Sequence, residues 1–99
     1  MKYHFQIYDK AKDDIHNIYD RYQRETLSTH TRFLDQLDHT FELILFSPKT
    51  LRVREHGFRV AYMKNFPHEI IYDVYGDTIV VIGVMHGKQD MNSFLEDRY

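Results

Sequence analysis

The feature that most constrains the fold is the apolar run from Thr78 to Met85, which reads TIVVIGVM. A strand that is apolar on both faces belongs in the interior of a sheet, because a half-exposed strand alternates apolar and polar residues. The chain continues at once with His86, Gly87 and Lys88. An interior strand is held by neighbours on both sides, so its end is a rigid place to mount these polar groups.

Three further strands are predicted from period-two patterns. Residues 3–8 and 58–62 alternate in this way, and so do residues 70–75. The Gly-Asp pair at 76–77 is typical of a two-residue hairpin turn leading into the apolar run. The Asn-Phe-Pro triplet at 65–67 predicts the preceding turn.

Two amphipathic helices are predicted between the first and second strands. Asp9 stands at an N-cap position, and apolar residues at helical spacing follow over residues 15–22. Leu27 marks a break, Ser28 is placed to cap the second helix, and Pro48 ends it because the residue before a proline avoids the helical region. Joined by a short connection, the helices should form an antiparallel hairpin on the sheet. The expected apolar face of the second helix comprises Phe33, Leu34, Leu37, Phe41, Ile44 and Leu45.

The predicted fold class is therefore α+β, in the order β-α-α-β-β-β with a short C-terminal tail. The chain of 99 residues can bury one hydrophobic core but not two, so residues 1–99 are expected to form a single domain. The N-terminus has no apolar signal-peptide core, and no apolar stretch reaches the roughly 20 residues that span a bilayer. A cytoplasmic protein without membrane contact is expected.

The sequence contains no motif that predicts a metal site or a cofactor site. There is no cysteine, so neither a disulfide framework nor a thiolate metal site can form. The seven histidines lack the spacing of a zinc site, and no glycine-rich phosphate loop or nucleophile elbow occurs. We therefore expect no metal and no cofactor.

Basic residues are concentrated in one part of a slightly acidic chain. The formal net charge of −2 argues against a general nucleic-acid-binding surface. Between Ser47 and Lys64, however, the only acidic residue is Glu55. These charges also fit an ordinary solvated surface. The basic residues of this segment are Lys49, Arg52, Arg54, Arg59 and Lys64.

The candidate chemical site consists of Arg59, His86 and Lys88, with Arg52 and Arg54 nearby in sequence. Such a set suits RNA cleavage without a metal, in which a ribose hydroxyl attacks the adjacent phosphate. Histidine exchanges protons near neutral pH, and the planar fork of arginine holds two phosphate oxygens. The alternative is that His86 merely ends a strand and hydrogen-bonds to a loop.

Residues 58–90, FRVAYMKNFPHEIIYDVYGDTIVVIGVMHGKQD, resemble the toxins of the RelE/ParE superfamily, from bacterial type II toxin–antitoxin systems. That family has a glycine shortly before an arginine, here Gly57 and Arg59, then a Phe-Pro turn, an I-x-Y strand and a hairpin. Its final strand ends in His-x-Arg-Arg-Asp, here HGKQD at 86–90. The segments AKDDIHNIYDRY and TRFLDQLDHTFELILFSP resemble its two helices, so the resemblance covers nearly the whole chain.

The resemblance implies a twisted, mainly antiparallel four-stranded sheet packed against an N-terminal helical hairpin. It also implies a toxin in the bacterial cytoplasm, held by a cognate antitoxin in a toxin–antitoxin hetero-oligomer. Apolar surface left over on the hairpin is where we expect that partner to dock.

Two branches of the superfamily imply different targets. The RelE-like branch cuts messenger RNA on the ribosome. In that case Arg59 would bind phosphate, His86 would transfer the proton, Lys88 or Arg54 would stabilise charge, and Arg52 and Arg54 would contact RNA.

The ParE-like branch poisons DNA gyrase and needs no catalytic residues. Here Lys88 and Gln89 replace the arginine pair, which removes one charge and the bidentate fork at the first position. Glu96 and Asp97 add negative charge to the tail, and Tyr99 is its terminal aromatic residue. These departures favour the ParE-like reading. The alternatives are a RelE-like nuclease and an inactive antitoxin-binding module.

Overall fold

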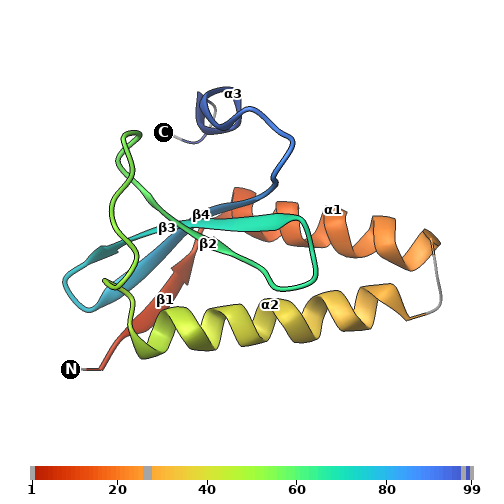
Figure 1. The fold of residues 1–99 in the computed structure, drawn as a ribbon, viewed down its shortest axis with the longest axis horizontal. Helices are drawn as coiled ribbons and strands as arrows, with labels where there is room; N and C mark the ends of the chain where they lie inside the picture. The colour runs from red at the N-terminus through yellow and green to blue at the C-terminus, as the bar shows by residue number, and fades with distance from the viewer. Residues whose placement is uncertain (1, 26–27, 97, 99) are drawn as a thin grey trace.

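A four-stranded mixed sheet lies at the centre of the computed structural model, which describes residues 2–25, 28–96 and 98 (Figure 1). The strands follow the order β1-β4-β3-β2 across the sheet, and only the β1–β4 pair is parallel. The predicted α+β class with a mainly antiparallel sheet is therefore confirmed. The strands are β1 (His4–Ile7), β2 (Arg59–Tyr62), β3 (His68–Tyr75) and β4 (Thr78–His86).

The interior position predicted for the apolar run is confirmed, because β4 pairs with β1 on one side and β3 on the other. Tyr75 lies opposite Thr78, so the predicted two-residue hairpin joins β3 to β4. Gly76 has a φ of 62°, a left-handed conformation that glycine adopts without steric cost. Ile7 at the end of β1 pairs with Val81 in the middle of β4.

The two predicted helices are α1 (Asp9–Glu25) and α2 (Thr29–Phe46), which run side by side on one face of the sheet (Figure 1). Ser28 occupies the N-cap of α2, but its side chain makes no capping hydrogen bond. The expected break at Leu27 falls outside the described residues. Proline after Ser47 ends α2 where predicted.

One prediction about the face of α2 is wrong. Leu45 is exposed, whereas Phe33, Leu37 and Ile44 are buried against the sheet. Successive residues of a helix are rotated by about 100°, so Leu45 turns away when Ile44 points inward. On the buried side, Tyr72 from β3 packs in the same core as these residues.

The C-terminal segment is a helix rather than the short tail that we predicted. The helix α3 (Met91–Glu96) covers the face of the sheet opposite α1 and α2 (Figure 1). Leu95 packs there on Val60, Ile71 and Ile82. The sheet is therefore covered on both faces, which explains why β4 is apolar on both. The predicted roles of Asp97 and Tyr99 fall outside the described residues.

An ion pair between Arg98 and Asp14 holds the segment after α3 against α1, beside the part of β4 that extends beyond β1. The guanidinium of Arg98 donates two hydrogen bonds of 2.7 Å each to the carboxylate of Asp14 on α1. The same carboxylate accepts the backbone N–H of Val84 at 3.0 Å, beyond the point where β1 ends. Both charged side chains are mostly buried, and paired Arg–carboxylate bonds of this kind are strong and directional.

None of the helices in the described part of the chain combines the length and the apolar character that crossing a bilayer requires.

Candidate functional site

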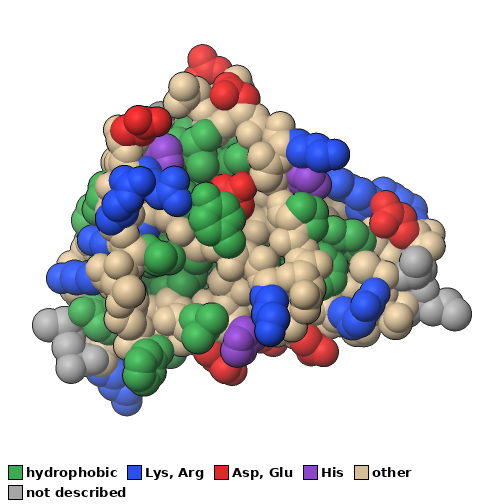
Figure 2. Space-filling view, in the orientation of Figure 1, with side chains coloured by type: hydrophobic (Ala, Val, Ile, Leu, Met, Phe, Trp, Pro, Cys, Tyr) green, Lys and Arg blue, Asp and Glu red, His purple; other side chains and the backbone are tan. Residues whose placement is uncertain are grey.

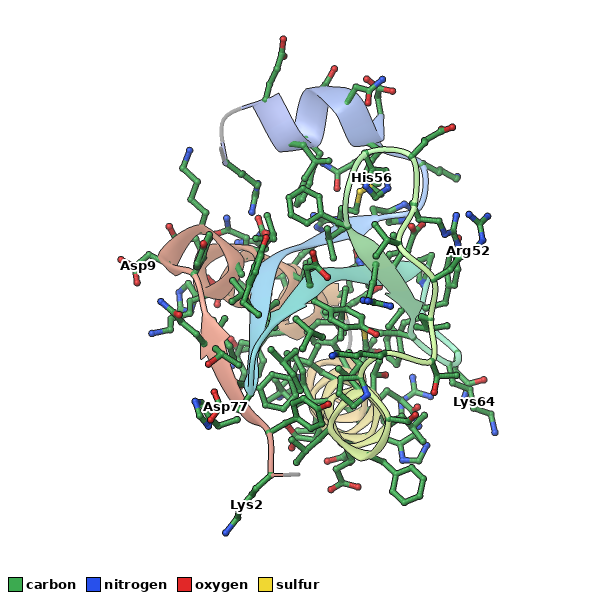
Figure 3. All side chains as sticks on the ribbon, turned by 90° about the vertical axis from the view of Figure 1, so that its left-hand side faces the viewer. Lys2, Asp9, Arg52, His56, Lys64 and Asp77 are labelled. Carbon is green, nitrogen blue, oxygen red and sulfur yellow. The ribbon has the colours of Figure 1, made fainter. Side chains whose placement is uncertain are left out.

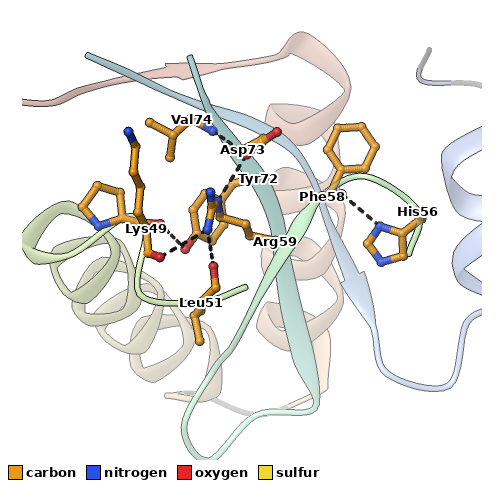
Figure 4. A network of polar contacts seen from close by, with 9 residues as sticks. Lys49, Leu51, His56, Phe58, Arg59, Tyr72, Asp73 and Val74 are labelled. Atoms are coloured by element: carbon orange, nitrogen blue, oxygen red, sulfur yellow. Dashed lines mark hydrogen bonds and ion pairs between the residues drawn. The ribbon is translucent and has the colours of Figure 1, made fainter. Parts of the chain in front are cut away.

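Arg59 joins the loop after α2 to the sheet (Figure 4). Its Nε donates to the carboxylate of Asp73 at 3.3 Å, and its Nη1 donates to the carbonyl oxygens of Lys49, at 3.3 Å, and of Leu51. The side chain is 15% exposed. The guanidinium is therefore engaged by one carboxylate and two backbone carbonyls, a structural arrangement that leaves few of its donors for a phosphate.

The sheet register separates Arg59 from His86, contrary to the expectation that they form one cluster. Arg59 pairs with Tyr72, which pairs with Val81 on β4. His86 lies five residues further along β4, or about 16 Å at the rise of a strand. Since β2 and β4 run in the same direction, the start of β2 cannot lie beside the end of β4.

His86 and Lys88 belong to a tight turn at the end of β4. The Nδ1 of His86 accepts the backbone N–H of Lys88 at 3.0 Å, and Gln89 accepts the backbone N–H of His86 through Oε1 at 2.8 Å. Gly87 donates its N–H to the carbonyl of Pro67 at 2.7 Å. Lys88 is exposed. It follows His86 in the same turn, and both residues are therefore far from Arg59.

A second histidine, which the sequence did not single out, lies directly beside His86. His68 is 2% exposed and pairs with His86 across the β3–β4 ladder, with ring centroids 5.3 Å apart. Its Nε2 is 3.0 Å from the hydroxyl of Tyr22. Burial, followed by the nearby charges of His86 and Arg21, lowers the pKa of His68 to about 4, so this imidazole is neutral at physiological pH.

Arg52 and Arg54 both lie on the loop between α2 and β2, where Figure 2 shows Lys and Arg side chains gathered at the left of the molecule. Arg52 projects outward from this loop, whereas His56 lies beside α3 (Figure 3). Arg54 donates to the hydroxyl of Tyr62 at 3.2 Å, and its guanidinium carbon stands 6.0 Å from the centre of that ring. The loop is a basic surface beside the sheet.

An apolar groove lies next to this loop, between the end of α2 and strand β2. We call it the α2 groove; it has a volume of ≈ 440 Å³. Its rim carries Phe46, which is 90% exposed, Tyr62 at 62% and Leu43 at 58%. Large apolar side chains with this exposure are unusual in a small monomer and mark an interaction surface. Its lining residues include Leu43, Ile44, Phe46, Leu51, Tyr62 and Tyr72.

A signal for the α2 groove was present in the sequence. Residues 43–46 read Leu-Ile-Leu-Phe, and four consecutive apolar residues go around the whole circumference of a helix. A helix on the surface of a sheet can bury only one stripe, so some of these side chains must be exposed. The predicted surplus of apolar surface on the helical hairpin corresponds to these exposed residues.

Within residues 2–25, 28–96 and 98, no three His, Asp or Glu side chains are grouped so that they could hold a metal ion.

Comparisons with known proteins identify the family. The profile of the family "ParE toxin of type II toxin-antitoxin system, parDE" matches residues 6–91. A solved chain of the "Chromosomal ParDE TA system from P. aeruginosa" is similar over 85% of this chain and 95% of its own, with a TM-score of 0.75 and 17% sequence identity. At that identity the structural likeness shows the fold alone, and no curated protein matches the sequence. The family match over most of the chain shows that this protein belongs to the ParE toxins of type II toxin–antitoxin systems.

Proposed function

We propose that this toxin inhibits growth by binding DNA gyrase, without catalysing a reaction itself, and that a cognate antitoxin neutralises it. One observation carries the proposal: Arg59 and His86, the residues first considered for RNA cleavage, do not lie together. Arg59 is bound to Asp73 and to backbone carbonyls, and along the strand direction it is about 16 Å from His86. Membership of the ParE toxins supports the same choice over a RelE-like nuclease.

The target can be tested with the purified chain in two parallel assays. We expect it to inhibit supercoiling by purified DNA gyrase and to leave messenger RNA intact in a reconstituted translation reaction. Lys88→Gln is a useful variant, because Lys88 is exposed and would stabilise charge in a nuclease. This variant should inhibit gyrase as well as the parent chain does.

Cleavage of messenger RNA that requires ribosomes and is weakened by Lys88→Gln would instead establish the RelE-like alternative. A chain that affects neither gyrase nor translation, and whose induced expression does not slow growth, would be an inactive antitoxin-binding module.

The α2 groove supports a docking site for the antitoxin. Its apolar rim at Phe46 and Leu43 can receive the apolar side of an amphipathic segment. Arg52 and Lys49 on the adjoining loop add positive charge beside it. We therefore propose that the antitoxin segment is amphipathic and acidic, with its apolar residues in the groove and its carboxylates toward the loop.

A further inference from the structure

A second, polar hollow lies at the other end of the helical hairpin. We call it the β4-end hollow; it has a volume of ≈ 210 Å³. Asn17 and Arg21 line it from α1, where a spacing of four residues places them on the same face of the helix. His86 lines it from the last position of β4, Gln89 from the turn that follows, and His68 from β3.

Three of the side chains around the β4-end hollow, those of Arg21, His86 and Gln89, have hydrogen-bond donors to offer. His86 accepts the N–H of Lys88 at Nδ1, so its neutral ring carries the proton on Nε2. Gln89 uses its Oε1 to accept the backbone N–H of His86, which leaves the two N–H donors of its amide. Within the described residues, the guanidinium of Arg21 has no hydrogen-bonding or ion-pair partner.

Among the described residues that line the hollow, the net charge is positive. Arg98 and Asp14 also line it, but their bidentate ion pair balances their charges, which leaves the charge of Arg21. The neighbouring His68 is buried. The pKa of His68 is lowered in part by Arg21, as expected where a positive potential reaches the ring.

We propose that the β4-end hollow is an oxyanion site that takes a phosphate group of a nucleic-acid backbone, held by Arg21, His86 and Gln89. These three donors come from α1, the last position of β4 and the turn that follows. A tetrahedral phosphate presents oxygens toward donors on several sides, whereas a carboxylate presents two oxygens in one plane. The proposal concerns this hollow alone and does not depend on which target the toxin acts on.

Of the residues first considered for phosphate chemistry, His86 belongs to this site, whereas the arginines lie elsewhere. Arg59 and Arg54 hold other groups on the loop side of the sheet. The chain carries a net charge of −2, so it has no general affinity for polyanions. A single phosphate site would let the toxin contact the nucleic-acid backbone at one position without binding along its length.

The test is a titration of the isotope-labelled chain, followed by NMR at constant ionic strength. Inorganic phosphate should shift the side-chain amide signals of Asn17 and Gln89, and a short DNA duplex should shift the same signals. Arg21→Gln should weaken phosphate binding about tenfold, a loss of about 1.4 kcal/mol. Arg24→Gln, an exposed arginine of the same helix that does not line the hollow, should leave binding unchanged.

Each other outcome has a defined meaning. An equal response to acetate would overturn the preference for phosphate in favour of a carboxylate from a protein partner. A response to inorganic phosphate without a response to the duplex would keep an oxyanion site but overturn its nucleic-acid source. No shift at Asn17 and Gln89, or equal losses in Arg21→Gln and Arg24→Gln, would overturn the site itself.

Discussion

At the scale of single residues, two buried polar side chains tie other elements to the sheet. The hydroxyl of Tyr72 on β3 donates to the carbonyl of Pro48 at 2.9 Å and so holds the chain just after α2. His68 on β3 meets the hydroxyl of Tyr22 on α1 at 3.0 Å. The first bond is buried and the second is partly buried among aromatic rings, so an unsatisfied polar group at either place would be costly.

The lowered pKa of His68 makes stability depend on pH. The unfolded chain protonates this residue below about pH 6.5, whereas the folded chain does so only near pH 4. The unfolded state therefore binds more protons between these values, and the free energy of unfolding should fall as the pH drops from 6.5 to 4. For one residue this amounts to about 3 kcal/mol, which urea denaturation at several pH values can measure.

The matched control for this effect is His68→Gln, which keeps a hydrogen-bonding group for Tyr22 but cannot be protonated. His68→Gln should lower the free energy of unfolding at neutral pH. Between pH 6.5 and pH 4, however, that free energy should fall less in the variant than in the parent chain. A parent and a variant that lose stability in parallel would assign the acid sensitivity to other groups.

A second prediction concerns the hydroxyl of Tyr72. Tyr72→Phe should lower the free energy of unfolding by about 1–3 kcal/mol, because it leaves the carbonyl of Pro48 without its donor in a buried position. Tyr62→Phe is the control, since Tyr62 is exposed and its hydroxyl accepts an exposed hydrogen bond from Arg54. Equal effects of the two substitutions in urea denaturation would count against a special role for the buried bond.

At the scale of elements, the sequence predicts the strands and the long helices well, because each shows an alternating pattern, a helical pattern or a continuous apolar run. It does not predict α3, whose six residues are too few to show a helical period. That helix is stabilised by packing Leu95 and Phe94 on the sheet. The expectation that Arg59 and His86 lie together was wrong, since they are separated by strand register, which no local pattern encodes.

The packing of α3 on β4 leads to a prediction at Gly83. A Cβ at this position would come within 2.6 Å of the Phe94 ring and 2.7 Å of the Arg98 guanidinium. Gly83→Ala should therefore displace the C-terminal segment and lower the free energy of unfolding by about 1–3 kcal/mol. Urea denaturation of the purified variant measures this loss.

A double-mutant cycle identifies the cause of that loss. Phe94→Leu removes the ring atoms that the new methyl group would meet, so Gly83→Ala should cost less in that background, by about 0.5 kcal/mol or more. Strictly additive effects of the two substitutions would place the strain elsewhere.

At the scale of the whole molecule, covering the sheet on both faces leaves the α2 groove as the main concentration of exposed apolar side chains among the residues described. Such a surface is expected to be covered when the toxin is held by its partner. The basic loop beside it and the β4-end hollow lie at separate places on the molecule, so partner binding and phosphate binding can be tested independently.

Phe46→Glu tests whether the α2 groove receives the antitoxin. The side chain is 90% exposed, so the substitution should leave the free energy of unfolding nearly unchanged. The affinity of the Phe46→Glu chain for the co-expressed antitoxin, measured by calorimetry, should fall about tenfold or more, because a charge would replace an apolar side chain that anchors the partner. Tyr75→Glu, at an exposed aromatic residue of the β3–β4 hairpin, should bind normally. Unchanged binding by Phe46→Glu would move the docking site elsewhere.

The parallel pairing of β1 with β4 has a consequence for the newly made polypeptide. His4–Ile7 gain their neighbouring strand only after residues 78–81 have been synthesised, so β1 cannot be paired before β4 exists. Until then both long helices lack the completed surface on which they pack. A nascent chain that stalls before β4 leaves the ribosome exit tunnel should therefore be unable to poison the cell that makes it.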